Sequence, residues 1–277
     1  MLRKLMKHEF RATGRIMLPM LLLTLLTAVG ANVSVRRLLD AGNGLAVILG
    51  ALLLAAFVLA VIGVCVMSFV LMIRRFYQNL LRDEGYLMMT LPVSVHQQIL
   101  SKALVSVVWF VVTAAVVALS ILILIADVGL VRAVAQGFEQ MLVALGESGW
   151  ALSEHARAML AVVLLWAPLL MVLGVLYMCL QCYAAMAIGH SFSAHKGVLS
   201  VAAYIGIQVV QGVLSSGAGW LLARTGLAAG IAQLLESMRY GWSVHLAMLG
   251  MFALNALLAV LMHAITAHFL TRRLNLE

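Results

Sequence analysis

Charged residues are scarce in this chain. Lys, Arg, Asp and Glu make up 10% of its 277 residues, 65% are hydrophobic, and the mean hydropathy is +1.10. An ordinary soluble domain has about 25% charged and about 45–50% apolar residues, so this composition excludes a soluble globular protein. Long uncharged runs are typical of an integral membrane protein. Because helices satisfy their own backbone hydrogen bonds in lipid, we expect an all-α polytopic fold.

Cysteine is also rare, with three residues in the whole chain. Cys65, Cys179 and Cys182 all lie in apolar segments, which argues against a disulfide framework. Cys179 and Cys182 have the spacing of a redox motif or of half a zinc site. No second pair and no flanking histidine completes that motif, so we interpret both as residues that pack in a membrane helix.

Catalytic and cofactor-binding motifs are not visible either. The eight histidines include two pairs spaced by five residues, which is off one helical face, so no metal site is expected. The nearest approach to a phosphate loop, residues 189–196 (GHSFSAHK), lacks the Gly before the Lys and the Ser or Thr after it. We therefore expect no catalytic residue and no cofactor in this chain.

Six apolar segments match or exceed the roughly 20 residues that a membrane-spanning helix needs. They comprise residues 16–35, 44–73, 103–126, 158–188, 198–223 and 244–270. The second is about 45 Å long at about 1.5 Å per residue, so it must tilt or protrude from a hydrocarbon core about 30 Å thick. We expect it to continue as one long helix to Arg82. No soluble domain or repeat is visible, so residues 1–277 are interpreted as a single membrane domain.

The net charge of +8 is distributed unevenly between the connections. Twelve of the 18 Lys and Arg residues lie in residues 1–15, 74–102, 189–197 and 271–277, and the other six are balanced by six acids in the remaining connections. The positive-inside rule places the basic side, with both termini, in the cytoplasm, and residues 127–157 and 224–241 outside. The predicted location is the cell membrane, and the charge requires no nucleic-acid partner.

Short amphipathic helices are expected outside the spans. Residues 1–15 place four apolar residues opposite four basic ones, which is typical of an interfacial helix; the alternative is a solvated positive flank that only orients the first span. Residues 131–145 and 231–238 repeat apolar residues every three or four positions, which predicts two helices on the outer surface. Pro168 lies inside the fourth span and should kink it.

The connection between the second and third spans, residues 74–102, carries the densest local signals. It begins as an amphipathic helix, which Asp83-Glu84-Gly85 breaks with a residue suited to a tight turn. Thr90-Leu91-Pro92 imposes extended backbone before the proline. Ser94, with Gln97 three residues later, predicts a capping box that opens the next helix. A short projection of this kind can fit a groove on another protein.

This segment resembles the cytoplasmic signature of ABC exporter permeases of the two-component drug-exporter type. The membrane subunit of that family is a six-helix, type V-like permease, and its ATPase is a separate polypeptide. The family signature is the coupling element between the second and third membrane helices. The matching residues here are Asp83, Glu84, Gly85, Leu91, Pro92, Val93, Ser94 and Lys102. The family often has Thr after the Gly, where this chain has Tyr86.

The resemblance implies a permease that moves its substrate out of the cell by alternating access. Its partners would be two ATPase subunits, which bind ATP and Mg, and a second permease subunit, identical or related. The residues expected to couple to the ATPase are Asp83, Glu84, Gly85, Tyr86, Leu87, Met88, Leu91, Pro92 and Ser94. Since no charge lies near a span centre, we favour an amphipathic, peptide or lipid-like substrate over ion-coupled transport. The alternative is a non-transporting scaffold or sensor that docks a cytoplasmic partner through residues 83–92.

Polar side chains within the apolar segments are the second set of candidates. They are Gln181, Tyr204, Gln208, Gln211, Ser215 and Asn255. Polar groups in a membrane usually face protein or a water-filled cavity. These residues therefore line a substrate pathway or form hydrogen bonds between helices, which are worth about 0.6 kcal/mol each. The sequence does not choose between the two.

Overall fold

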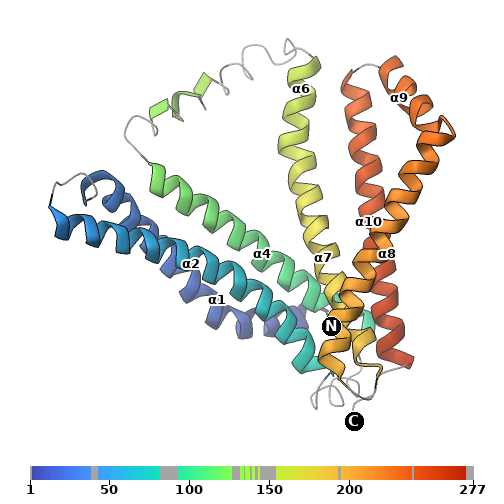
Figure 1. The fold of residues 1–277 in the computed structure, drawn as a ribbon, viewed down its shortest axis with the longest axis horizontal. Helices are drawn as coiled ribbons and strands as arrows, with labels where there is room; N and C mark the ends of the chain where they lie inside the picture. The colour runs from blue at the N-terminus through green and yellow to red at the C-terminus, as the bar shows by residue number, and fades with distance from the viewer. Residues whose placement is uncertain are drawn as a thin grey trace. The chain divides into compact units, whose positions relative to one another are not determined.

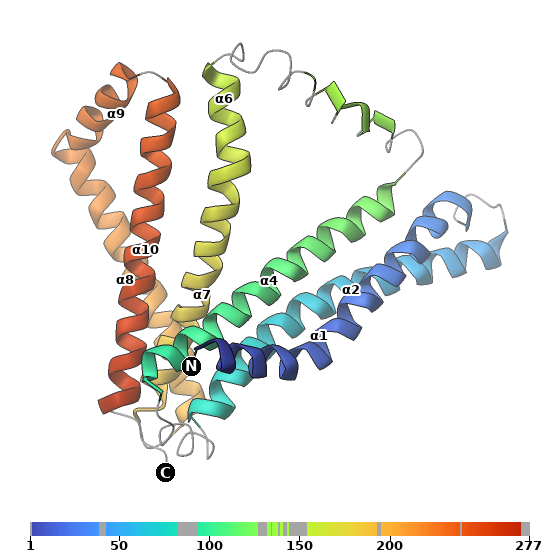
Figure 2. The same ribbon diagram turned by 180° about the vertical axis from the view of Figure 1, so that it is seen from behind.

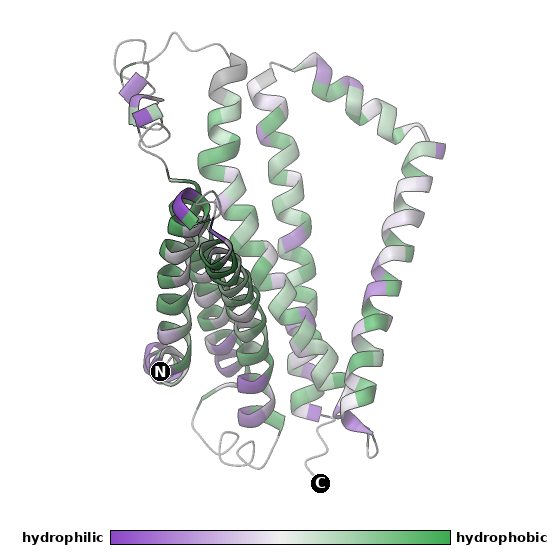
Figure 3. Cartoon of the chain, turned by 60° about the vertical axis from the view of Figure 1, so that its left-hand side comes forward, coloured by the Kyte–Doolittle hydropathy of each residue, from purple (hydrophilic) through white to green (hydrophobic). Residues whose placement is uncertain are grey.

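The computed structural model describes residues 2–38, 43–81, 93–126, 154–192, 195–238 and 240–272, with short pieces at 132–133, 135–137, 139–140 and 143. Within these ranges the chain is helical and has no strand. Six helices are long and apolar enough to cross a membrane: Arg3–Leu38, Gly44–Leu81, Val95–Ile125, Ala158–Gly189, Lys196–Arg224 and Gly241–Arg272. Hydrophobic residues cover most of each long helix (Figure 3). The predicted all-α, multi-pass membrane architecture is therefore confirmed.

The helices belong to two compact units. Unit 1 comprises Met1–Met72 and Leu104–Trp150, and unit 2 comprises Ile73–Ala103 and Ala151–Glu277. The boundary falls inside helix α2 (Gly44–Phe76) and inside helix α4 (Val95–Ile125). The last turn of α2 and the first turns of α4, which flank residues 82–92, therefore both belong to unit 2.

Unit 1 is built from α1 (Leu2–Val33), the π-helical segment η1 (Ser34–Leu38) and the larger parts of α2 and α4 (Figure 1). Its core consists of two clusters in which side chains of these helices meet. The buried members are Met17, Leu21, Val64 and Leu71 in the first cluster, and Ala28, Ala31 and Phe57 in the second. Small residues such as the two alanines let helices approach closely, which is how van der Waals packing holds membrane helices together.

Polar side chains in unit 1 pair between helices. The Ser68 and Thr113 hydroxyl oxygens are 2.9 Å apart, which joins α2 to α4. The Asn32 side-chain amide of α1 donates to the carbonyl oxygens of Ile123 and Leu124 in the last turn of α4. The last carbonyl groups of a helix lack the usual N–H partner four residues later, and an unpaired backbone group is costly in lipid. Asn32 thus completes the end of a neighbouring helix.

The N-terminal amphipathic segment is not a helix of its own. Helix α1 runs without a break from Leu2 to Val33 and contains Pro19. The predicted apolar face is present, because Leu5, Met6 and Phe10 are half-buried. The basic residues opposite it are exposed: Arg3, Lys4, Lys7 and Arg11. The boundary expected near residue 15 is therefore absent, and the segment continues directly into the first span.

Unit 2 contains the end of α2, the π-helical segment η2 (Tyr77–Leu81), the start of α4 and the C-terminal helices. The latter are α6 (Glu154–Ala161), η3 (Val162–Trp166), α7 (Ala167–Gly189), α8 (Lys196–Arg224), α9 (Leu227–Ser237) and α10 (Tyr240–Arg272). Helix α7 packs against both α8 and α10 (Figures 1 and 2). Every residue of α7 from Cys179 to Ala187 is buried, whereas α8 has no buried residue. The C-terminal half of α7 is therefore the core of this unit.

Two local expectations concern irregular parts of the spans. Helical structure continues from α2 through η2 to Leu81, so the long second helix is confirmed as far as the described residues extend. Near Pro168 the hydrogen bonding changes to the π type over Val162–Trp166. A proline has no N–H to donate to the preceding turn, and a π-helical segment is one known response to such an interruption.

The expected outer helices are described only in part. Helix α9 contains most of residues 231–238, where a short helix was predicted. Ile231 and Leu234, two members of its apolar stripe, are exposed. The apolar stripe predicted within residues 131–145 lies outside the described residues.

Candidate functional site

The coupling candidates lie almost entirely outside the described residues. Ser94 is described, whereas the others are not: Asp83, Glu84, Gly85, Tyr86, Leu87, Met88, Leu91 and Pro92. The structure does describe both flanks of this segment, namely the end of α2 with η2 before it and the start of α4 after it. Both flanks belong to unit 2, so their contacts show which helices the segment is tied to.

The first flank packs against α7 through aromatic rings. The rings of Phe76 and Tyr183 are stacked, with centroids 4.0 Å apart and planes inclined by 8°. Phe76, Tyr183 and Leu80 are completely buried. Tyr77 meets the His190 ring edge-on, with centroids 5.3 Å apart. Aromatic pairs add about 0.5–1.5 kcal/mol beyond the area that they bury, so this flank is held firmly on the C-terminal half of α7.

The second flank begins at Ser94 and packs against α10. The Gln97 backbone N–H donates to the Ser94 carbonyl at 3.0 Å and, over a longer 3.4 Å, to the Ser94 hydroxyl. The serine part of the predicted capping box is therefore present. His96 Nδ1 and His263 Nε2 are 2.9 Å apart, which ties the first turn of α4 to α10. Ile99 is fully buried one turn later.

Helices α7 and α8 are in close contact at Gly189, beside the first flank. A Cβ atom built on Gly189 would overlap the hydroxyl, backbone nitrogen and Cα of Ser200, so only a glycine fits there without movement. His195, the residue before α8, has a left-handed backbone conformation with φ 51°. That conformation is uncommon for a residue with a side chain. The described residues at the two ends of this connection, Gly189 and His195, are therefore conformationally constrained.

His190 lies at the start of the connection between α7 and α8, in surroundings that favour its neutral form. Its Nδ1 donates a hydrogen bond to the Met186 carbonyl at 2.9 Å, and its side chain is almost fully buried. Burial lowers the pKa of His190 below its usual 6.5, and the nearby Lys196 lowers it further, against the opposing effect of the Met186 bond. Since the folded chain disfavours the protonated ring, the contribution of His190 to stability is lost as the pH falls below about 6.5.

The intramembrane candidates do not form one site. Gln181 and Gln211 belong to a network that links α7 to α8: the Gln181 amide donates to the Gln211 side-chain oxygen at 3.1 Å. The Gln211 amide donates to the Tyr177 hydroxyl. The sequence analysis missed Tyr177, although its position four residues before Gln181 puts both on one face of α7.

The other four candidates bond within their own helices. Gln208, which is exposed, donates to the Tyr204 hydroxyl at 3.1 Å. The Ser215 hydroxyl donates to the Gly212 carbonyl at 3.0 Å, and the Asn255 amide donates to the Met251 carbonyl at 2.9 Å. These contacts show pairing of polar groups, and they leave Gln208 and Ser215 on the open surface of α8.

Comparisons with known proteins were made at the levels of family, sequence and structure. No protein-family model, curated protein or solved structure matches this chain.

The two glutamines on α8 should respond differently to replacement. Gln211→Leu removes both bonds to α7, so we expect it to lower the free energy of unfolding by about 1 kcal/mol, at about 0.6 kcal/mol for each bond. Gln208→Leu lies three residues earlier on the same helix and should change stability little. Unfolding by detergent titration in mixed micelles measures both variants. An equal loss in the two would contradict an interhelical role for Gln211.

Proposed function

We propose that this chain is the membrane-spanning permease subunit of an ATP-driven ABC exporter. It would lie in the cell membrane with both termini in the cytoplasm and move an amphipathic, peptide or lipid-like substrate outward by alternating access. Three features support this: the six long apolar helices, the excess of basic residues in one set of connections, and the resemblance of residues 83–102 to the coupling element of that family.

The observation that carries the proposal is the packing of the two flanks of residues 82–92. Phe76 is stacked on Tyr183 of α7, and His96 is bonded to His263 of α10. Buried, closely packed elements move together because protein interiors are dense and resist deformation. A partner that displaces residues 83–92 would therefore also act on α7 and α10. This is the arrangement that a coupling element requires.

The energy for transport would come from other polypeptides. This sequence has no phosphate loop, so two separate ATPase subunits would bind ATP and Mg and engage the coupling segment. A second permease, identical or related, would complete the transport path. The exposed surface of α8, with Gln208 and Ser215, is open to line that path or to meet that subunit.

Purification of the full chain from native membranes in mild detergent tests the assignment. We expect a separate subunit with a phosphate loop to copurify, at one copy per chain if the second permease is identical and two copies if it is only related, and the reconstituted assembly to hydrolyse ATP. Recovery of a stable complex without any nucleotide-hydrolysing subunit would favour the scaffold or sensor instead. The two outcomes differ in composition as well as in activity, so either one decides between the functions.

A further inference from the structure

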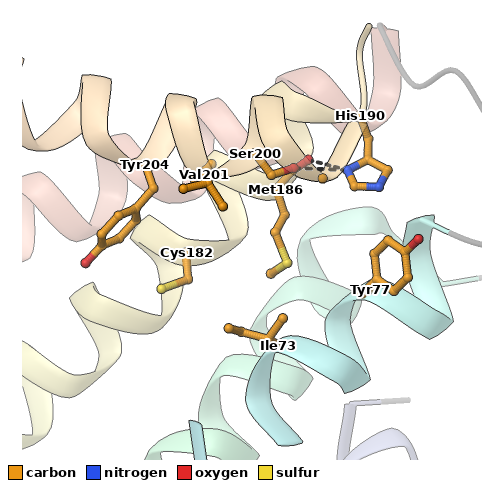
Figure 4. A pocket seen from close by; sticks show the side chains of 10 residues that line it. Ile73, Tyr77, Cys182, Met186, His190, Ser200, Val201 and Tyr204 are labelled. Carbon is orange, nitrogen blue, oxygen red and sulfur yellow. Dashed lines mark hydrogen bonds between the residues drawn. The ribbon is translucent and has the colours of Figure 1, made fainter. Parts of the chain in front are cut away.

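An apolar cavity of about 340 Å³ lies in unit 2, at the end where η2, α7 and α8 meet. Ile73, Cys182, Met186 and Val201 line its middle, and Figure 4 shows Tyr204 at one end and Tyr77 with His190 at the other. Lining residues come from these three elements and from Ile73 in the last turn of α2. Its volume is at the lower end of the roughly 300–1,000 Å³ that is usual for ligand pockets.

The exposed lining is almost entirely apolar, and some of its polar atoms already have partners. The Ser200 hydroxyl already donates to the Lys196 carbonyl at 2.9 Å, and the Tyr204 hydroxyl already accepts from Gln208. A buried water needs about two to four polar partners. An apolar cavity within membrane helices is therefore better filled by hydrocarbon. The cavity is long enough for an acyl chain, because Tyr204 is eight residues from Lys196, which is about 12 Å along a helix.

Basic residues adjoin the cavity lining in the sequence. Arg74 and Arg75 are in the last turn of α2 beside Ile73, and Lys196 is the first residue of α8. The acids that the structure describes in unit 2 are Glu154 and Glu236, at the start of α6 and near the end of α9. Glu154 opens the segment that leads through η3 into α7, and the cavity lies at the far end of α7. A lipid with an apolar acyl chain and an anionic head group matches this distribution of apolar and basic residues.

We propose that the cavity binds one acyl chain of an anionic membrane lipid, with the lipid head group against Arg74, Arg75 and Lys196. The chain would enter between η2 and α8 and reach as far as Tyr204. Such a lipid site does not depend on the proposed transport function. It would, however, place a lipid against Tyr77 and Met186, on the flank that the coupling segment shares with α7.

Photoreactive lipids test this directly in the full chain, reconstituted in phosphatidylcholine nanodiscs. The probe is phosphatidylglycerol with a diazirine in one acyl chain, and its control is phosphatidylcholine with the same chain. We expect adducts on Cys182 and Met186 in preference to the exposed Val209 and Val213 of α8. A basic residue near a membrane surface favours an anionic lipid about fivefold, so the anionic probe should label at least about fivefold more.

Gly197→Leu should block the site. A Cβ atom on Gly197 meets nothing within 4 Å, and Gly197 lines the cavity, so the new side chain fills open space. Gly206→Leu is the matched control, because Gly206 lies on the same helix, is equally open and is not part of the lining. We expect cavity labelling to fall at least about fivefold in the first variant and to remain in the second. Arg75→Gln should reduce the labelling preference for the anionic lipid over phosphatidylcholine about fivefold.

Three outcomes would overturn the lipid site. Labelling could be spread evenly over the lipid-facing residues of α8, which is the result for ordinary surrounding lipid. The Gly197→Leu and Gly206→Leu variants could give equal yields of the cavity adducts. Excess oleate could remove the cavity adducts at concentrations that leave surface adducts intact, which would assign the cavity to a free fatty acid.

Discussion

Replacing Leu91 with Asp is expected to release the partner ATPase, or to disconnect its turnover from transport, while all six spans remain inserted. Leu91 is one of the apolar residues of the coupling segment, with Tyr86, Leu87 and Met88. Truncation of such a residue in an interface typically costs about 2 kcal/mol or more, which is about thirtyfold in affinity. A buried carboxylate adds the cost of an unpaired charge.

Binding of the ATPase to the reconstituted permease, measured with increasing ATPase concentration, gives the loss in affinity. Lys7→Ala, on the exposed basic face of α1, is the control and should bind almost normally. Asp83 and Glu84 should contribute to steering, so their replacement should have smaller effects that depend on salt. Normal binding and normal transport by Leu91→Asp would mean that residues 83–92 are an ordinary loop.

Gly189→Ala is expected to destabilise unit 2 strongly. The added methyl group would overlap Ser200, including its backbone nitrogen and Cα, so no simple side-chain rotation relieves the clash. Overpacking of a tight core costs about 1–3 kcal/mol, and displacement of a helix backbone should place this variant at the upper end. The bonds that join α7 to α8 would weaken with it, because they depend on the same crossing.

Gly174→Ala is the matched control on the same helix. A Cβ atom there meets nothing within 4 Å, and Ala is more favourable than Gly inside a helix by about 1 kcal/mol. The two substitutions should therefore shift the thermal unfolding temperature in opposite directions. Equal shifts would show that α7 and α8 do not cross closely at Gly189.

Hydropathy was sufficient to predict the six spans, because the bilayer sets the length of each helix and penalises charge within it. The extension of α2 to Leu81 also followed from local periodicity. The continuity of α1 could not be predicted from periodicity, because residues 2–15 are amphipathic whether they lie on the surface or prolong a span. Its boundaries depend on packing, which a periodic pattern does not contain.

Contacts between distant residues could not be predicted from one sequence. Nothing local pairs Phe76 with Tyr183, or His96 with His263, since each pair lies on two different helices. Polar residues within the spans can be picked out from the sequence, although Tyr177 was overlooked, but the contacts that each residue makes depend on its neighbours. Gln211 meets Tyr177 and Gln181 across a helix interface, whereas Gln208 faces the open surface three residues away.

Site-specific photocross-linking tests the central claim most directly. A benzoylphenylalanine residue is placed at Met88, in the coupling segment, or at Gln140, which is predicted to lie outside the cell. The account predicts a covalent adduct between position 88 and the ATPase subunit, with a yield that changes with ATP, and no such adduct from position 140. Cross-linking of the ATPase from position 140, or none from position 88 in an assembly that hydrolyses ATP, would contradict it.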